Sequence, residues 1–112
     1  MNSYYGDIMV KNLDCFSFEE KIKSENNSII IDVRTLEEFK EVRIPNAILI
    51  DIYEQNFLDK INELDKNKPY FVYCRSGVRS LTACQQMIKL GFSKVYNLKD
   101  GIISWEGETE QG

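Results

Sequence analysis

The residues of this sequence best suited to catalysis or to anion binding are a cysteine and the two arginines and glycine that closely follow it. The segment comprises Cys74, Arg75, Ser76, Gly77, Val78, Arg79 and Ser80. The preceding run 69–73, rich in aromatic and β-branched residues, predicts a buried strand, and 78–90 predicts a helix. A short loop that opens a helix presents amide N–H groups and the helix dipole to an anion. A thiolate is an anion, so we predict a thiolate-stabilising loop around Cys74.

The absence of histidine limits how this cysteine is activated. Because none of the 112 residues is histidine, cysteine–histidine pairs, Ser-His-Asp triads and histidine metal sites are excluded. The loop amides and the arginines remain as the means of stabilising a thiolate. The other two cysteines make an odd total without a CxxC pair, which suits neither a disulfide framework nor a zinc site. We interpret Cys84, on an apolar helix face, as a core residue and Cys15 as structural.

Strand and helix patterns alternate along the chain, which predicts an α/β fold with a mainly parallel sheet and helices on its faces. Capping-box patterns begin at Ser17 and Thr35, and each predicts the start of a helix. The expected strands are 7–10, 28–33, 47–51, 69–73 and 94–98. The expected helices are 17–24, 35–41, 53–64, 78–90 and a last turn at 102–105. In such a sheet Cys74 follows a strand at the edge where open α/β sheets bind ligands.

Length and composition favour a single globular domain over residues 1–112, in which the polar tail 106–112 frays. A net charge of −4 gives no electrostatic case for binding nucleic acid or an anionic membrane surface. No apolar stretch approaches the roughly 20 residues that span a bilayer, so no membrane partner is expected. The first ten residues lack a signal-peptide pattern, and we therefore expect a cytoplasmic protein.

Three segments, in order along the chain, resemble the rhodanese family of sulfurtransferases. The first is Asp32–Phe39 with its continuation Ile44–Ala47, the second is the loop Cys74–Ser80, and the third is Gly91–Trp105. Together they extend the resemblance over almost the whole chain. The sequence departs from the family where Arg43 occupies the place of a common histidine, so we assign Arg43 no catalytic role.

The resemblance implies a rhodanese-like α/β fold, with a central parallel sheet of about five strands flanked by helices. It also implies a reaction in two halves. The Cys74 thiolate takes the outer sulfur of thiosulfate, or of another sulfane-sulfur donor, and becomes a persulfide. A small thiol, a protein thiol or, in vitro, cyanide then accepts that sulfur. This scheme needs no metal and no organic cofactor.

The loop residues have separate expected roles in this scheme. Gly77 lets the backbone turn so that several N–H groups converge on the terminal sulfur. Arg75 and Arg79, two of only four arginines in the chain, are expected to lower the cysteine pKa and to hold a sulfonate. The hydroxyls of Ser76 and Ser80 are further possible donors.

Asp32 and Arg34 end a predicted strand on the same sheet edge as Cys74. We expect them to form a supporting scaffold, in which Arg34 pairs with Glu37 or Glu38 and Asp32 accepts loop N–H groups or an arginine. A direct chemical role for this pair is the less favoured alternative.

Three other functions stay open. The domain could relay sulfur to a protein acceptor, because a relay uses the same first half-reaction. It could also be a non-catalytic module that docks a partner with the loop surface, although binding alone does not demand a thiolate. A cysteine-dependent phosphatase is the least favoured, because those enzymes place one more residue between cysteine and arginine than the four that separate Cys74 from Arg79. The shorter loop suits a single sulfur atom better than a phosphoryl group.

Overall fold

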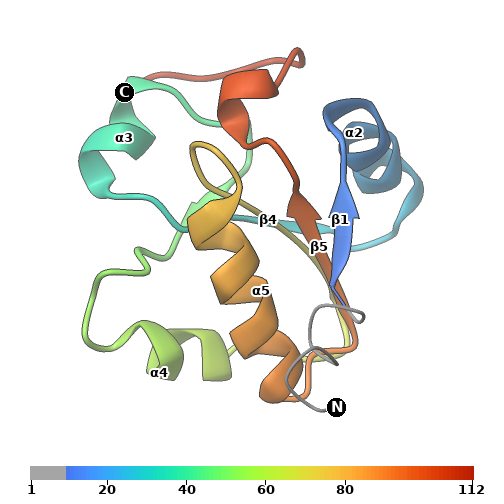
Figure 1. The fold of residues 1–112 in the computed structure, drawn as a ribbon, viewed down its shortest axis with the longest axis vertical. Coiled ribbons are helices and arrows are strands. Elements are labelled where there is room, and N and C mark those ends of the chain that lie inside the picture. Colours follow the sequence, from blue (N-terminus) through green and yellow to red (C-terminus); the bar gives the residue numbers. More distant parts are fainter. Residues whose placement is uncertain (1–9) are drawn as a thin grey trace.

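A computed structural model describes residues 10–112 and contains one sheet of five parallel strands with helices on both faces (Figure 1). The strands are β1 (Lys11–Leu13), β2 (Ile29–Asp32), β3 (Ile48–Leu49), β4 (Pro69–Tyr73) and β5 (Lys94–Leu98). The helices are α2 (Cys15–Ser24), α3 (Leu36–Glu41), α4 (Phe57–Asn62), α5 (Val78–Lys89) and the 3-10 turn η1 (Ile102–Ser104). The strand order β1-β5-β4-β2-β3 puts β4 at the centre. The predicted fold class is confirmed.

Alternate residues of β4 belong to two apolar layers, one on each face of the sheet. Tyr70 and Val72 pack in the layer covered by α4 and α5, whereas Phe71 and Tyr73 pack in the layer covered by α2. This period of two is the geometry of a strand, and burial on both faces explains why the run 69–73 is apolar throughout. The strand that leads into the Cys74 loop is therefore fixed from both sides.

The register between β2 and β4 brings the ends of two chemistry-bearing segments together. Asp32 of β2 lies beside Tyr73 of β4, and the Val33 N–H donates to the Tyr73 carbonyl at 3.1 Å. Parallel strands end at the same sheet edge, so the residues that follow Asp32 and those that follow Tyr73 are neighbours. Figure 1 shows the loop after β4 between α3 on one side and η1 on the other.

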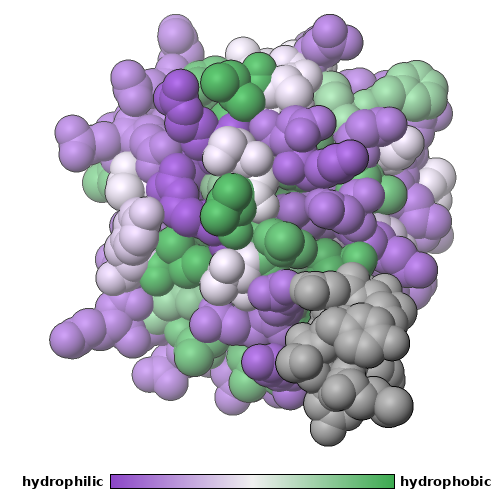
Figure 2. All heavy atoms as spheres, in the orientation of Figure 1, coloured by the Kyte–Doolittle hydropathy of each residue, from purple (hydrophilic) through white to green (hydrophobic). Residues whose placement is uncertain are grey.

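The outer surface over α4 and α5 is mostly hydrophilic, with hydrophobic side chains in small groups (Figure 2). Such scattered apolar groups are ordinary for a globular domain. None of the helices within residues 10–112 has the length and apolarity that crossing a bilayer requires.

The first two elements differ from their sequence-based predictions. The expected strand 7–10 lies outside the described residues except for Val10, which forms a bend, and β1 begins at Lys11. Helix α2 begins before Ser17, because the Asp14 carboxylate accepts a hydrogen bond from the Ser17 N–H at 2.8 Å and caps the helix. The capping box at Thr35 is confirmed, with both reciprocal hydrogen bonds to Glu38 present.

The segment predicted as helix 53–64 is helical only over Phe57–Asn62. Asp51 accounts for the shortening, because its side chain accepts a hydrogen bond from the Tyr53 N–H at 2.9 Å and holds the chain in a turn. The buried positions Phe57 and Ile61 keep the helical spacing that the sequence indicates.

The polar tail 106–112, which we expected to fray, makes specific contacts with α3 and with Arg43 shortly after that helix. Arg43 and Glu110 form an antiparallel bridge with hydrogen bonds of 3.0 and 2.9 Å, and the Gly112 N–H donates to the Lys40 carbonyl at 2.8 Å. The Arg43 guanidinium also lies 4.6 Å from the Phe39 ring centre and donates to the main-chain oxygen of Gly112 at 2.6 Å. The residue that replaces the family histidine therefore anchors the tail against α3.

Candidate active site

The sulfur of Cys74 lies at the centre of the loop that joins β4 to α5. Its Sγ accepts hydrogen bonds from the Gly77 N–H at 3.1 Å, from the Ser80 N–H at 3.4 Å and from the Ser80 hydroxyl at 3.3 Å. The Cys74 residue is only 1% exposed. The loop therefore surrounds the sulfur with donors, as an oxyanion hole surrounds an oxygen.

Gly77 makes this closed loop possible. Its φ of +99° is a left-handed conformation, and a Cβ at this position would lie 2.0 Å from the Lys99 carbonyl oxygen. Gly77 is also the N-cap of α5, so the first turn of a 12-residue helix points at Sγ. The helix dipole adds to the amide donors in favouring a negative charge on the sulfur.

The electrostatics of the loop favour the thiolate of Cys74. Burial is the largest single influence and acts to raise the pKa of the Cys74 thiol, because desolvation disfavours the charged form. Hydrogen bonds from the Ser80 hydroxyl and from the amides of Ser80, Gly77 and Ser76 act in the opposite direction. Together they outweigh burial, so the pKa of Cys74 is lowered. The donors that dominate are backbone amides and one hydroxyl, not the arginines.

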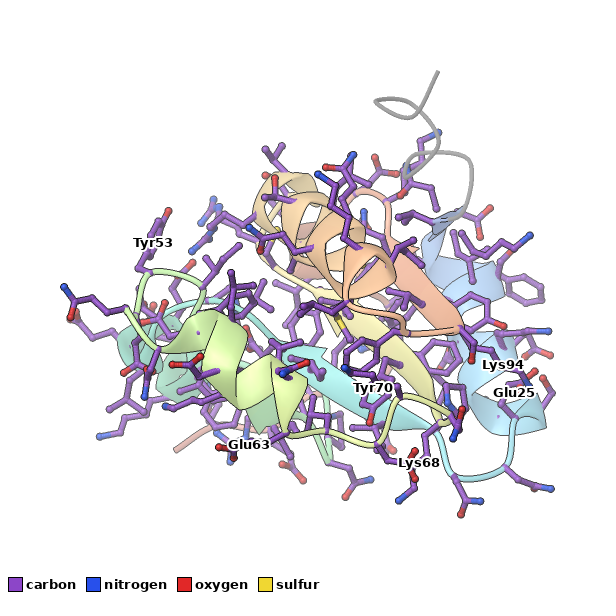
Figure 3. The ribbon with its side chains drawn as sticks, turned by 90° about the horizontal axis from the view of Figure 1, so that it is seen from below. Glu25, Tyr53, Glu63, Lys68, Tyr70 and Lys94 are labelled. Carbon is purple, nitrogen blue, oxygen red and sulfur yellow. The ribbon has the colours of Figure 1, made fainter. Side chains whose placement is uncertain are left out.

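Arg79, which we expected to hold a sulfonate, is paired with an acidic residue in the structure. Its guanidinium donates to both carboxylate oxygens of Glu38, at 2.9 and 3.0 Å, and lies 5.7 Å from the ring centre of Tyr53. The Arg79 hydrogen bond is the main reason why the pKa of Glu38 falls to about 2. This bidentate pair ties α3 to the first turn of α5 across the loop. Tyr53 stands at this end of the molecule, opposite the surface pair of Lys94 and Glu25 (Figure 3).

The predicted supporting pair is formed differently from the sequence-based expectation. Arg34 binds Asp32, with distances of 2.9 Å from Nε and 2.7 Å from Nη2, and does not pair with Glu37 or Glu38. Both residues are buried. Because they lie two residues apart at the end of β2, the side chains curl back on one another, and Arg34 also donates to the Val42 carbonyl. The expectation that Asp32 accepts an arginine is confirmed, and the pair holds the turn between β2 and α3.

Beside the loop the surface is hollowed into a cleft of about 390 Å³. It is lined by Arg34, Glu38, Glu41, Val42, Arg75, Ile102, Ile103, Trp105 and Thr109. Arg75 and Ser76 are exposed, and Val78 is 71% exposed at the start of α5. Arg75 is thus the loop cation that faces this cleft, while Arg79 is held by Glu38.

Comparisons with known proteins agree with this geometry. A family model for the rhodanese-like domain matches residues 17–108. The chain belongs to the rhodanese-like family. YtwF of Bacillus subtilis, provisionally named a sulfurtransferase, is 38% identical over 90% of this chain and 95% of its own length. A thiosulfate sulfurtransferase of Coxiella burnetii is 31% identical over 88% of this chain and 90% of its own length.

A crystal structure of a rhodanese-like domain protein from Staphylococcus aureus has the same fold. It matches with a TM-score of 0.77 and 31% sequence identity, over 91% of this chain and 98% of its own. Together with the named relatives, this likeness supports a sulfur-transfer role of the rhodanese type. Such a role implies a sulfur donor and a thiol acceptor as its general partners.

Two residues beside this rhodanese-like site make contacts that sequence reasoning missed. Glu38 is assigned by its capping box to Thr35, yet its carboxylate also binds Arg79. Tyr53 is placed in a predicted helix, yet it lies in a turn with its ring beside Arg79. Only the sheet topology could have indicated the contact between Glu38 and Arg79. Glu38 follows β2 and Arg79 follows β4, and these neighbouring parallel strands end at the same edge of the sheet.

The other two cysteines lie apart from the donor ring of the rhodanese-like loop. Cys84 is fully buried in the layer between the sheet and α5, and burial raises its pKa, so its predicted place in the core is confirmed. Cys15 opens α2, and its sulfur accepts a hydrogen bond from the Glu106 N–H at 3.3 Å. This contact agrees with a structural role for Cys15.

Replacing Ser80 by alanine is expected to make Cys74 a weaker acid. The hydroxyl stabilises the thiolate, so its loss moves the pH midpoint of alkylation upward. Below that midpoint the alkylation rate falls about tenfold, because a hydrogen bond to a charged group contributes about 1.5 kcal/mol. Mass spectrometry of the Cys74 peptide across pH measures this rate. The control Thr82→Ala removes an exposed hydroxyl of the same helix, and an equal shift in both variants would contradict the assignment.

Proposed function

We propose that this rhodanese-like domain moves sulfane sulfur from a donor such as thiosulfate to a thiol acceptor through a persulfide on Cys74. The observation that carries the proposal is the convergence of two amides and a hydroxyl on the buried Sγ. Both half-reactions begin or end with negative charge on sulfur at this point. A preorganised ring of donors stabilises that charge without needing an imidazole.

The first half-reaction transfers one sulfur atom to the protein. The Cys74 thiolate attacks the outer sulfur of thiosulfate, and a new S–S bond forms. The bond between that sulfur and the sulfonate breaks, and its electron pair leaves with sulfite. The amides of Gly77 and Ser80 donate to Sγ, so they lie beside the persulfide that forms on it.

The second half-reaction regenerates the cysteine. An acceptor thiolate attacks the outer sulfur of the persulfide and becomes a persulfide itself. The electron pair of the broken S–S bond returns to Cys74, which is again a thiolate in its ring of donors. With cyanide as the acceptor the product is thiocyanate. No external oxidant or reductant enters either half.

Intact-mass spectrometry tests this function directly. Protein incubated with thiosulfate is expected to gain one sulfur atom, and addition of cyanide is expected to remove it and yield thiocyanate. A protein that gains no sulfur and forms no thiocyanate would refute thiosulfate as the donor. Repeating the loading step with a small-molecule persulfide distinguishes a different donor from a domain that does not transfer sulfur.

We further propose that Arg75 holds the sulfonate of thiosulfate, because it is exposed beside the cleft whereas Arg79 is bound to Glu38. Arg75→Gln is then expected to raise KM for thiosulfate about tenfold, since a charge-assisted hydrogen bond contributes about 1.5 kcal/mol. The alkylation profile of Cys74 should not move. Steady-state kinetics measures KM, and Arg75→Lys, which keeps the charge, should recover part of the loss. An unchanged KM in Arg75→Gln would exclude this role.

A sulfur relay to a protein acceptor is the second candidate function. Val78 is 71% exposed and Ile103 is 65% exposed, and they flank the loop on its two sides. Exposed apolar side chains next to a reactive sulfur suit contact with a protein surface. The relay and the small-molecule enzyme share the first half-reaction and differ only in the acceptor.

The remaining alternatives have less support. In a cysteine-dependent phosphatase the loop arginine must turn to the phosphoryl group, whereas Arg79 is held by Glu38. In a pure interaction module the donors around Sγ would have no purpose. We also propose a cytoplasmic location, because the three free cysteines suit a compartment that keeps thiols reduced.

A further inference from the structure

The segment 97–103, which runs from the end of β5 into η1, binds the outward side of the Cys74 loop; we call it the rear brace. The Ile102 N–H donates to the Cys74 carbonyl at 2.9 Å, and the Ile103 N–H donates to the Arg75 carbonyl at 3.2 Å. The Asn97 side chain donates from Nδ2 to the Gly77 carbonyl at 3.3 Å. Three loop carbonyls are therefore directed away from the sulfur and into the rear brace.

The direction of a carbonyl fixes the direction of the next amide. In a planar trans peptide the C=O of one residue and the N–H of the following residue point in opposite directions. Because Ile103 holds the Arg75 carbonyl on the outer side, the Ser76 N–H is turned inward, toward the sulfur. The Ser76 amide is among the donors that lower the pKa of Cys74. The rear brace thus acts on the sulfur without touching it.

Asn97 is the member of the rear brace that acts through a side chain. It is 1% exposed, and its Nδ2 also donates to the Asn12 side chain at 2.9 Å. Its buried Oδ1 has no hydrogen-bond partner among the described residues. Burial of such an oxygen costs free energy that an apolar side chain of similar size avoids. The buried Oδ1 offsets part of what the two Nδ2 hydrogen bonds contribute to stability, and one of those two bonds is directed at the Cys74 loop.

We infer that Asn97 is a positioning residue for sulfur transfer: by binding the Gly77 carbonyl it fixes the Gly77–Val78 peptide at the start of α5, and so keeps in place the glycine whose own N–H binds Sγ. This inference rests on the proposed function only in its statement that the positioned cysteine transfers sulfur. Both backbone polar groups of Gly77 are hydrogen-bonded. Its N–H donates to Sγ, and its carbonyl accepts from the Asn97 side chain and from the Leu81 N–H. Loss of the Asn97 donor leaves Leu81 alone to fix that carbonyl.

Substitution of Asn97 leaves unchanged the charged and titratable side chains that face Cys74. Helix α5 contributes Arg79 and Cys84, and α3 contributes Glu38, whose carboxylate neutralises Arg79. Arg75 of the loop itself points to the cleft. A change in the acidity of Cys74 after substitution of Asn97 therefore reports the loop amides.

The test compares Asn97→Leu with the control Asn12→Ala, which removes the other partner of the Asn97 amide at an exposed position. In Asn97→Leu, alkylation of Cys74 at a pH below the midpoint is expected to slow about fivefold, and the midpoint to move to higher pH. Thermal unfolding is expected to stay within a few degrees of the unsubstituted protein, and kcat to fall more than KM rises. Asn12→Ala should leave the alkylation profile unchanged.

The outcomes separate the positioning role from the proposed function. A folded Asn97→Leu protein with an unchanged alkylation midpoint overturns the positioning role. If that variant does not fold, Asn97→Ser, whose shorter side chain cannot reach Gly77, decides by the same criterion. Failure of the unsubstituted protein to gain sulfur from thiosulfate overturns the proposed donor instead, and the alkylation profile still tests Asn97.

Discussion

Cys74→Ser is expected to abolish sulfur loading and to lower turnover by about a thousandfold or more, the scale at which loss of a covalent nucleophile acts. A serine hydroxyl is not ionised near neutral pH, so it does not attack the outer sulfur of a donor. The donors around this position still find an oxygen to bind, and the fold is expected to persist. Intact mass after incubation with thiosulfate measures loading, and thiocyanate formation measures turnover.

Cys15→Ser is the matched control for this result. It also replaces one thiol by a hydroxyl, but at a position whose sulfur accepts a hydrogen bond only from the Glu106 N–H among the contacts of the described residues. We expect this variant to gain one sulfur atom from thiosulfate. If Cys74→Ser gains sulfur from thiosulfate, or if Cys15→Ser fails to gain it, the assignment of Cys74 as the residue that takes up sulfur is contradicted.

The loop was predictable from the sequence because its causes are local. A glycine with positive φ, the start of a helix and the end of an apolar strand all lie within the stretch from Pro69 to Ser80. The two apolar layers follow for a similar reason, since continuous apolar runs and helical spacing are read along a few residues. The Thr35 capping box is equally local, and it formed as predicted.

The partners of the charged residues were not predictable in the same way. Arg79 and Glu38 are 41 positions apart, and only the order of β2 and β4 in the sheet brings them together. Sequence reasoning paired Glu38 with the nearer Arg34, but Asp32 is closer still and is buried with it. The tail shows the same limit, because its polar residues are held by Arg43, an interaction that polarity alone does not reveal.

Gly101→Ala is expected to lose at least about 3 kcal/mol of unfolding free energy together with most of the activity. Gly101 has a φ of +76°, and a Cβ there would lie 2.0 Å from the Arg75 carbonyl oxygen and 2.5 Å from the Ser76 nitrogen. Real Cβ atoms do not approach backbone this closely, so the rear brace must move away from the loop. Denaturant titration measures the stability, and alkylation of Cys74 measures the effect on the loop.

Gly91→Ala is the reference for a positive-φ glycine whose Cβ meets no backbone. Gly91 has a φ of +100°, but the nearest atom to a Cβ there is Lys66 Cδ at 3.8 Å. Both alanine variants bear the strain of a positive φ, but Gly101, with a ψ of −178°, lies in a region that essentially only glycine occupies, and only Gly101→Ala adds a collision with the peptide between Arg75 and Ser76. The difference between the two losses therefore contains the larger backbone strain at Gly101 together with the close approach of the rear brace to the loop. Equal losses with unchanged alkylation in both variants would mean that the loop keeps its donors on Cys74 without that contact.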